Sequence, residues 1–316
     1  MSADVAAAAA VIRSADRIAV AGHVGPDGDA LGSMLALARA ARNAGKDAWA
    51  SFGEPFVLPH HFDYLDRSTL VAPGDLPTDI DLFVACDTPV PQRLGTLAPV
   101  ADGAASVLVI DHHRSDGGFG DVELIDREAA ATTQLVFRLL GELGWEIDEP
   151  IATALYTGLV TDTGRFQYSA TTPEVHHMAA ELLAVGVRPD LVGQQLFEQA
   201  PFGYYAVVAK VMGRAVLESE LGLVWSVMYA ADRGDVPYQE TDGLIDLVRI
   251  AGEAGVACLF KEIQAGVFKG SLRSRGLVDV AAIASRLGGG GHHNAAGFTH
   301  RGEPEAALTT IRSLLA

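Results

Sequence analysis

Aspartate and histidine side chains follow three short apolar segments of the chain. The segments are 17–21 (RIAVA), 81–86 (DLFVAC) and 106–110 (SVLVI). The polar residues that follow them are His23, Asp27, Asp29, Asp87, Asp111, His112 and His113. Short apolar runs of this kind are typical of buried parallel strands, whose carboxyl ends place ligands at one edge of a sheet. Ionised acids brought together repel one another unless a cation neutralises them, so the sequence predicts a metal cluster at this edge.

The mixture of ligands limits the identity of the metal. Imidazole and carboxylate groups without a nearby cysteine favour a borderline divalent ion, Mn²⁺ before Mg²⁺, with Zn²⁺ or Co²⁺ able to enter the same site. An alternative remains for the first segment, in which Asp29 only caps the following helix and Pro26-Asp27-Gly28 is an ordinary turn.

The elements that must position these residues alternate between strands and helices. Helical spacing of apolar residues predicts helices at 30–44, 129–143, 151–159 and from Thr172 onward, so the first part is α/β with a parallel sheet covered on both faces. Beyond about residue 200, hairpin signals at 215–229 and 256–273 are combined with helices at 241–252, 278–287 and 304–315, which predicts an α+β domain.

Length and charge exclude several classes of protein. The chain has 316 residues, about twice a common domain, and its formal charge is 23 − 40 = −17. A broad electrostatic grip on long duplex nucleic acid or on an anionic membrane is therefore not expected. The two cysteines, the absence of a basic leader and the lack of a long apolar stretch favour a cytoplasmic protein.

Four motifs resemble those of the DHH phosphoesterases. They are His23-x-x-Pro26-Asp27-Gly28-Asp29-Ala30-x-Gly32-Ser33, Asp87, Asp111-His112-His113 and Thr161-Asp162-Thr163-Gly164. Farther on, Gly289-Gly290-Gly291-His292-x-Asn294-Ala295-Ala296-Gly297 looks like the signature of the DHHA1 domain. Order and spacing fit nearly the whole chain, and its length is similar to the NrnA-like branch, bifunctional oligoribonucleases and 3′-phosphoadenosine 5′-phosphate phosphatases. Thr132-Thr133-Gln134 departs from the Ser-Thr-Glu-like segment of the family.

The resemblance implies a role for each of these residues. Two Mn²⁺ ions would be held, one by His23 and Asp27 and the other by Asp29, His112 and Asp162, with Asp87 bridging both. Asp111 and His113 would be catalytic residues that orient a ligand or stabilise the phosphoryl oxygens. The implied substrate-binding residues are Arg273, Arg275, Gly289, Gly290, Gly291, His292 and Asn294. The alternative for this last set is a flexible glycine loop with exposed neighbours.

The expected architecture is a DHH catalytic domain over residues 1–190, a linker over 191–211 and a smaller α+β DHHA1 domain over 212–316, with an active-site cleft between the domains. The expected activity is Mn-dependent hydrolysis of short oligonucleotides (nanoRNA and dinucleotides) and 3′-phosphoadenosine 5′-phosphate by metal-activated water. Alternatives are a cyclic dinucleotide (c-di-AMP type) phosphodiesterase and a non-catalytic nucleotide sensor. Family II pyrophosphatases resemble the first domain but lack a second domain of the GGGH type, so Gly289 to His292 discriminate against them, and RecJ-type exonucleases are usually larger. A homodimer is left open.

Overall fold

The computed structural model describes residues 4–113 and 118–316, apart from the side chain of His292. The chain divides into two compact units, Met1–Gln199 and Ala200–Ala316. Within the expected linker 191–211, the helix α7 (Pro189–Phe197) ends in the first unit and α8 (Tyr204–Gly213) begins in the second.

The first unit is built on a five-stranded sheet in the order β2-β1-β3-β4-β5, in which every pair is parallel. Its strands are β1 (Arg17–Ala21), β2 (Asp47–Ser51), β3 (Leu82–Cys86), β4 (Ser106–Asp111) and β5 (Val122–Ile125). The three predicted strands are thereby confirmed as β1, β3 and β4. The strands β2 and β5, which the sequence analysis did not predict, extend the sheet at its two edges.

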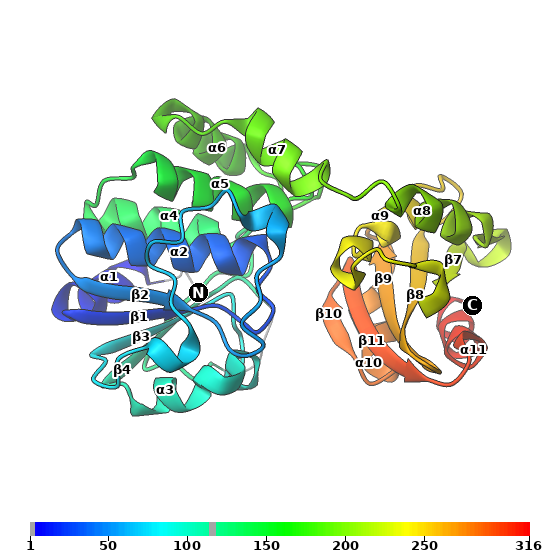
Figure 1. Ribbon diagram of the computed structural model, residues 1–316, viewed down its shortest axis with the longest axis horizontal. Helices are drawn as coiled ribbons and strands as arrows, with labels where there is room; N and C mark the ends of the chain where they lie inside the picture. Colours follow the sequence, from blue (N-terminus) through cyan, green and yellow to red (C-terminus); the bar gives the residue numbers. More distant parts are fainter. Residues whose placement is uncertain (1–3, 114–117) are drawn as a thin grey trace. The chain divides into compact units, whose positions relative to one another are not determined.

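Helices cover both faces of this sheet, as predicted. They are α1 (Val5–Ser14), α2 (Gly28–Asn43), α3 (Ala98–Gly103), α4 (Thr132–Leu143), α5 (Glu149–Asp162), α6 (Pro173–Val185) and α7. Figure 1 shows α2, α4 and α5 on one side of the strands and α3 on the other. Alternate residues of β3 illustrate the two cores, because Val84 packs into the larger cluster with α2 and α4 while Phe83 packs into the smaller one with Leu97 and α3.

Two glycines bring α2 and α5 close together. A Cβ at Gly32 would lie 2.3 Å from the carbonyl oxygen of Ala154, and a Cβ at Gly158 would lie 2.7 Å from Oδ1 of Asp29. Both distances are shorter than real Cβ contacts, so only glycine permits this approach. The close packing places the N-terminus of α2 beside the C-terminal half of α5. One candidate ligand lies on each of these helices, Asp29 on α2 and Asp162 on α5.

The second unit is a six-stranded sheet in the order β10-β11-β9-β8-β7-β6. Its strands are β6 (Val216–Glu218), β7 (Leu223–Met228), β8 (Val256–Gln264), β9 (Val267–Ser274), β10 (Gly290–His292) and β11 (Ala295–Arg301). All pairs are antiparallel except β7 with β8. Its helices are α8, α9 (Leu244–Val248), α10 (Val280–Arg286) and α11 (Pro304–Leu315). The α+β prediction and both hairpins are confirmed.

Two local predictions in this unit are wrong. The helix expected at 241–252 is shorter than predicted: α9 spans Leu244–Val248, with Gly243 at its N-cap and Arg249 at its C-cap. The alternative of a flexible loop at 288–291 is also wrong in part, because Gly290 and Gly291 belong to the strand β10. A Cβ at Gly289 would lie 2.1 Å from the carbonyl oxygen of Gly297, and one at Gly291 would lie 2.6 Å from that of Ala295. These two glycines therefore allow this segment to approach β11 closely.

Candidate metal centre

The parallel register brings the ends of β1, β3 and β4 to one edge of the first sheet. Ala21 pairs with Ala85, and Cys86 pairs with Ile110, so the residues that follow each strand are neighbours. Among the described residues, three overlapping groups have ligand atoms within 4.8 Å of one another. They are His23, Asp27 and Asp87; Asp29, His112 and Asp162; and Asp87, His112 and His113. All six predicted metal ligands and His113 thus lie together.

His23 anchors the first group from the loop after β1. Its Nε2 lies 3.5 Å from Oδ2 of Asp87 and 3.7 Å from Oδ2 of Asp27, and this buried atom has no hydrogen-bond partner in the described part of the chain. Its Nδ1 lies 3.0 Å from the carbonyl oxygen of Val24, which can only accept, so Nδ1 carries the proton. This contact places the Nδ1 proton and leaves Nε2 facing the two carboxylates, the arrangement found in metal-ligating histidines.

His112 holds the corresponding position in the second group. Its Nε2 lies 3.1 Å from Asp162 and 3.8 Å from Asp29, while its Nδ1 donates to the carbonyl oxygen of Ala129 at 3.3 Å. Asp162 is the last residue of α5 and Asp29 lies in the first turn of α2, so the close packing of these helices completes the group.

Asp87 connects the two groups. Its Oδ2 faces His23, and its Oδ1 lies 3.6 Å from Nε2 of His112 and 3.3 Å from Nδ1 of His113. The residue has a φ of 57°, a left-handed conformation that is uncommon outside glycine, asparagine and aspartate. Only 2% of the residue is exposed. A buried carboxylate with its two oxygens facing different groups can bridge two cations.

Two threonines that the sequence analysis did not assign hold the aspartates in place. Oγ1 of Thr132 donates to Oδ1 of Asp87 at 2.9 Å. The backbone N–H groups of Thr132 and Thr133 donate to the two oxygens of Asp29 at 2.6 and 2.9 Å, and Oγ1 of Thr133 donates at 2.8 Å. Asp29 therefore caps α4 from another helix, because Ala131, at the N-cap, has no side chain that could do so. The signal in the sequence that could have indicated this role is the polar Thr-Thr pair at the start of an otherwise apolar helix.

Asp27, and not Asp29, caps α2. Oδ1 of Asp27 accepts from the N–H groups of Asp29 and Ala30 at 3.0 and 3.1 Å, which leaves its Oδ2 toward His23. The alternative in which Asp29 only caps its own helix is therefore wrong. The cap and the predicted ligand role are compatible because they use different oxygens of Asp27.

Asp111 and His113 form a pair beside the groups. Nδ1 of His113 donates to Oδ1 of Asp111 at 2.7 Å. Asp111 is fully buried, and its Oδ2 has no hydrogen-bond partner among the described residues, whereas the His113 side chain is 20% exposed. The buried Asp111 thus fixes the orientation of the His113 ring through this hydrogen bond. His113, which is partly exposed, is the member of the pair that a ligand can reach.

The electrostatics of the cluster are unfavourable without a cation. Burial raises the pKa of Asp29, and the charges of Asp162 and Asp87 raise it further. Burial and the neighbouring acids likewise raise the pKa of Asp162 to about 6, although His112 opposes this. Burial lowers the pKa of His23 and of His112, but the surrounding carboxylates outweigh burial and raise each to about 10. The chain alone must therefore bind protons here, and a divalent cation would relieve the same repulsion.

The donor set fits divalent cations. Each group contains imidazole nitrogens, which bind a metal in their neutral form, and carboxylate oxygens, but no cysteine. This mixture is suited to borderline ions such as Mn²⁺. The separations of 3.5 and 3.7 Å around Nε2 of His23 are long for hydrogen bonds. They are short enough for one ion with bonds of about 2.0–2.2 Å to contact Nε2 of His23 and a carboxylate oxygen at the same time. The site residues therefore fit the group that the sequence predicts.

In the second unit, the predicted substrate residues lie on or next to the strands β9 and β10, which are separated by β11. Arg273 and Arg275 lie close together at the surface, beside Arg249. Arg275 donates to the carbonyl oxygens of Arg249 and Ala251, at 3.1 and 3.0 Å. Oδ1 of Asn294 is buried without a hydrogen-bond partner among the described residues. The side chain of His292 lies outside what the structure describes. Gly290, on β10, has open space where a Cβ would project.

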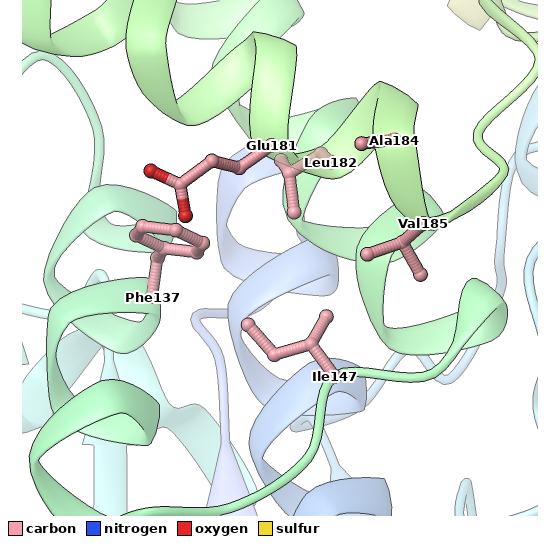
Figure 2. Close-up of a pocket in the computed structure, with 6 residues that line it drawn as sticks. All are labelled: Phe137, Ile147, Glu181, Leu182, Ala184 and Val185. Atoms are coloured by element: carbon pink, nitrogen blue, oxygen red, sulfur yellow. The ribbon is translucent and has the colours of Figure 1, made fainter.

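A separate hollow of about 410 Å³ lies on the first unit between α4 and α6. Figure 2 shows its lining residues, which are Phe137, Ile147, Glu181, Leu182, Ala184 and Val185. None of them belongs to the histidine and aspartate groups, and the lining is mostly apolar. This hollow is therefore distinct from the candidate metal centre.

Comparisons with known proteins find one family domain in each of the two units. Residues 17–159 match the model of the DHH family, N-terminal domain, and residues 226–316 match the DHHA1 domain. The chain is 37% identical over 288 residues to a bifunctional oligoribonuclease and PAP phosphatase NrnA of Thermus thermophilus, covering 90% of this chain and 84% of that protein. It is 28% identical to the cyclic-di-AMP phosphodiesterase GdpP of Geobacillus thermodenitrificans, covering 89% of this chain but 44% of that protein.

A solved structure shares the fold. The crystal structure of an exopolyphosphatase-related protein from Bacteroides fragilis aligns with a TM-score of 0.90 at 24% identity, covering 98% of this chain and 95% of that one. At this identity the likeness shows the fold alone. None of the described helices is both long enough and apolar enough to span a membrane.

Proposed function

The chain belongs to the DHH family, and from this premise we propose that it is a metal-dependent phosphoesterase that hydrolyses short oligonucleotides and 3′-phosphoadenosine 5′-phosphate. The observation that carries the proposal is the presence of two adjacent ligand groups, one with His23, Asp27 and Asp87 and one with Asp29, His112 and Asp162, with Asp87 also 3.6 Å from His112. A nucleotide sensor needs no such complete ligand set, which favours catalysis.

We assign His23 and Asp27 to one cation, Asp29, His112 and Asp162 to the other, and Asp87 to both. We propose Mn²⁺ for both positions, with Mg²⁺, Co²⁺ or Zn²⁺ as substitutes. When bound, such a pair acidifies a water molecule and neutralises charge that develops on the phosphoryl group. The contribution of the chain is to fix the ligands, through the carbonyl contacts of His23 and His112 and the threonine contacts of Asp29 and Asp87.

His113 is suited to act on the substrate itself. Burial lowers the pKa of its imidazole, but Asp111 and Asp87 outweigh burial and raise it to about 9, so the ring is protonated near neutral pH. A positively charged donor that is held by Asp111 and partly exposed can stabilise an anionic phosphoryl oxygen or protonate a leaving oxygen. Asp111 is then a positioning residue that acts through His113.

The second unit would supply substrate binding. Arg273 and Arg275 lie close together beside Arg249, and we propose that their positive charge attracts a substrate phosphate. We propose that Gly289, Gly290, Gly291, His292 and Asn294 complete this site. The net charge of −17 favours substrates of a few nucleotides over long polyanions.

The relatives favour one substrate class over its alternative. The NrnA protein matches along most of its length, whereas less than half of the GdpP protein is matched. We therefore place linear dinucleotides and 3′-phosphoadenosine 5′-phosphate before cyclic dinucleotides.

The test is product analysis with three substrates in parallel: a linear RNA dinucleotide, 3′-phosphoadenosine 5′-phosphate and cyclic di-AMP. The purified chain is stripped with a chelator and then supplied with Mn²⁺. We expect mononucleotides from the dinucleotide and adenosine 5′-monophosphate from the second substrate, both faster than any product from the cyclic one. Faster cleavage of cyclic di-AMP would favour the alternative, and binding without turnover of all three would show a sensor.

A further inference from the structure

An arginine of the first unit lies beside the metal centre without a partner from the chain. Arg93 belongs to the short helical segment Pro91–Leu97, which follows β3 and Asp87. The residue is half-buried, yet its side chain has neither an ion pair nor a hydrogen bond with the described residues. Arg39, which is also half-buried, is held by both Asp66 and Asp148. The N–H donors of Arg93 therefore remain available for a bound anion.

The backbone of Arg93 is fixed against the loop that carries His23. Its carbonyl oxygen accepts from the N–H of Val24 at 2.8 Å, and the carbonyl oxygen of Val24 in turn accepts from Nδ1 of His23. The chain then turns at Gly95, where φ is 58° and an added Cβ would lie 2.5 Å from Cγ2 of Val24. A hydrogen bond and close packing thus set the position of Arg93 relative to His23.

The charge of Arg93 acts on the metal centre from the side of His23. Burial lowers the pKa of His23, Asp27 and Asp87 raise it, and the charge of Arg93 lowers it again, which leaves this pKa at about 10. The guanidinium is therefore near the imidazole, although it forms no ion pair with Asp27, Asp87 or any other carboxylate in the described part of the chain. A site for an anion remains between the arginine and the ligand group.

The charge balance of the centre favours an anion at that place. The aspartates that we assign to the two cations are Asp27, Asp29, Asp87 and Asp162. Their four negative charges equal the charge of two divalent ions, so Arg93 and the protonated His113 add net positive charge. His113 contacts Oδ1 of Asp87, whereas His23 contacts Oδ2, so these two positive side chains act beside different oxygens of the shared carboxylate.

We propose that Arg93 binds a non-bridging oxygen of the scissile phosphate, on the side of the metal centre that His23 occupies. This inference rests on the proposed function, because it assumes that a phosphate is bound at the centre. A guanidinium presents its N–H donors in a planar fork that suits phosphate oxygens, and its charge stabilises the negative charge of the transition state. Arg273 is proposed to hold another part of the substrate, whereas Arg93 contacts the phosphate that every substrate shares.

The test replaces Arg93 by glutamine, which removes the charge and leaves the backbone contact with Val24. With Mn²⁺ present, kcat/KM is measured on an RNA dinucleotide and on bis-p-nitrophenyl phosphate, and inorganic phosphate is tested as an inhibitor of the second reaction. We expect kcat/KM to fall about 10- to 150-fold on both substrates, as for the loss of one charge-assisted contact. Inhibition by phosphate should weaken about fivefold or more.

Mn²⁺ affinity, measured by calorimetry, separates this role from a structural one. Arg93→Gln should leave the affinity unchanged or raise it, because a positive charge near the ligands is removed. Arg93→Lys keeps the charge but not the planar fork, and should regain part of the lost kcat/KM. Wild-type kcat/KM in Arg93→Gln, a loss confined to the dinucleotide, or a loss that accompanies weaker Mn²⁺ binding would overturn the proposal.

Arg13→Gln is the matched control. Arg13 is an exposed arginine in the last turn of α1, just before β1 begins, and therefore lies at the opposite edge of the sheet from His23. It should leave kcat/KM, phosphate inhibition and Mn²⁺ affinity unchanged, and losses equal to those of Arg93→Gln would refute a specific contact. If neither the dinucleotide nor 3′-phosphoadenosine 5′-phosphate is hydrolysed, but bis-p-nitrophenyl phosphate shows the Arg93 penalty, the role of Arg93 stands and the proposed function fails.

Discussion

Replacing Asp87 by asparagine tests the shared ligand directly. Asparagine has the same shape and tolerates the left-handed conformation that Asp87 adopts at φ 57°, so the turn after β3 should be preserved. The amide oxygen can still accept from Oγ1 of Thr132. The change therefore removes the negative charge that both groups face and replaces one oxygen, Oδ2 beside His23, by an amide nitrogen.

The size of the effect follows from the position of Asp87 in both groups. Loss of a residue that supports a metal costs 10- to 100-fold in affinity even when it is not itself a ligand, so we expect about 100-fold at each position. A factor of 100 is about 2.7 kcal/mol, and two positions give about 5 kcal/mol less stabilisation by saturating metal. For a unit of the size of Met1–Gln199, the rise in Tm on adding Mn²⁺ should be smaller by roughly 10–20 °C.

The assay combines three readings on wild type and Asp87→Asn: Mn²⁺ affinity by calorimetry, Tm with and without Mn²⁺, and turnover of a dinucleotide. We expect turnover to fall by at least three orders of magnitude, since one cation loses a ligand oxygen and both lose the neighbouring negative charge. Asp75→Asn is the control, because Asp75 is an exposed aspartate of the same unit outside the metal groups. Wild-type affinity at both positions together with turnover within tenfold of wild type would refute the bridging assignment.

Much of the first unit follows from local sequence, because the buried strands are continuous apolar runs and the helices have clear caps. Thr172 illustrates this, since its side chain caps α6 and Pro173 begins the helix as predicted. The edge strand β2 was missed because Asp47 and Ser51 at its two ends leave only three apolar residues in a row. Its strand conformation comes from pairing with β1, which a local pattern does not contain.

The candidate site divides in the same way. The ligands could be predicted because they follow strands directly in the sequence and match family motifs. The positioning contacts could not, because Thr132 and Thr133 act on aspartates 45 and 104 residues away in the sequence, across the sheet and the helix pair. Ala295, Ala296 and Gly297 belong to the predicted DHHA1 signature, but the pairing of Gly297 with β9 and β10 is a tertiary contact that the motif does not contain.

Three further predictions concern the cations, their supports and the substrate. Chelation should abolish hydrolysis, and Mn²⁺ should restore it better than Ca²⁺, whose oxygen-preferring shell suits imidazole poorly; full activity of metal-free protein would contradict the mechanism. Thr132→Val should weaken Mn²⁺ binding up to tenfold and lower the free energy of unfolding by about 1.5–3 kcal/mol, as measured by calorimetry and urea titration, while Thr132→Ser should restore both. Arg273→Gln should leave metal content unchanged but lower kcat/KM for a dinucleotide about 10- to 150-fold, because one charge-assisted contact to phosphate is lost. The penalty on bis-p-nitrophenyl phosphate, which needs only the cations, should be within about twofold, and equal penalties on both substrates would place Arg273 in the catalytic centre instead of the substrate site.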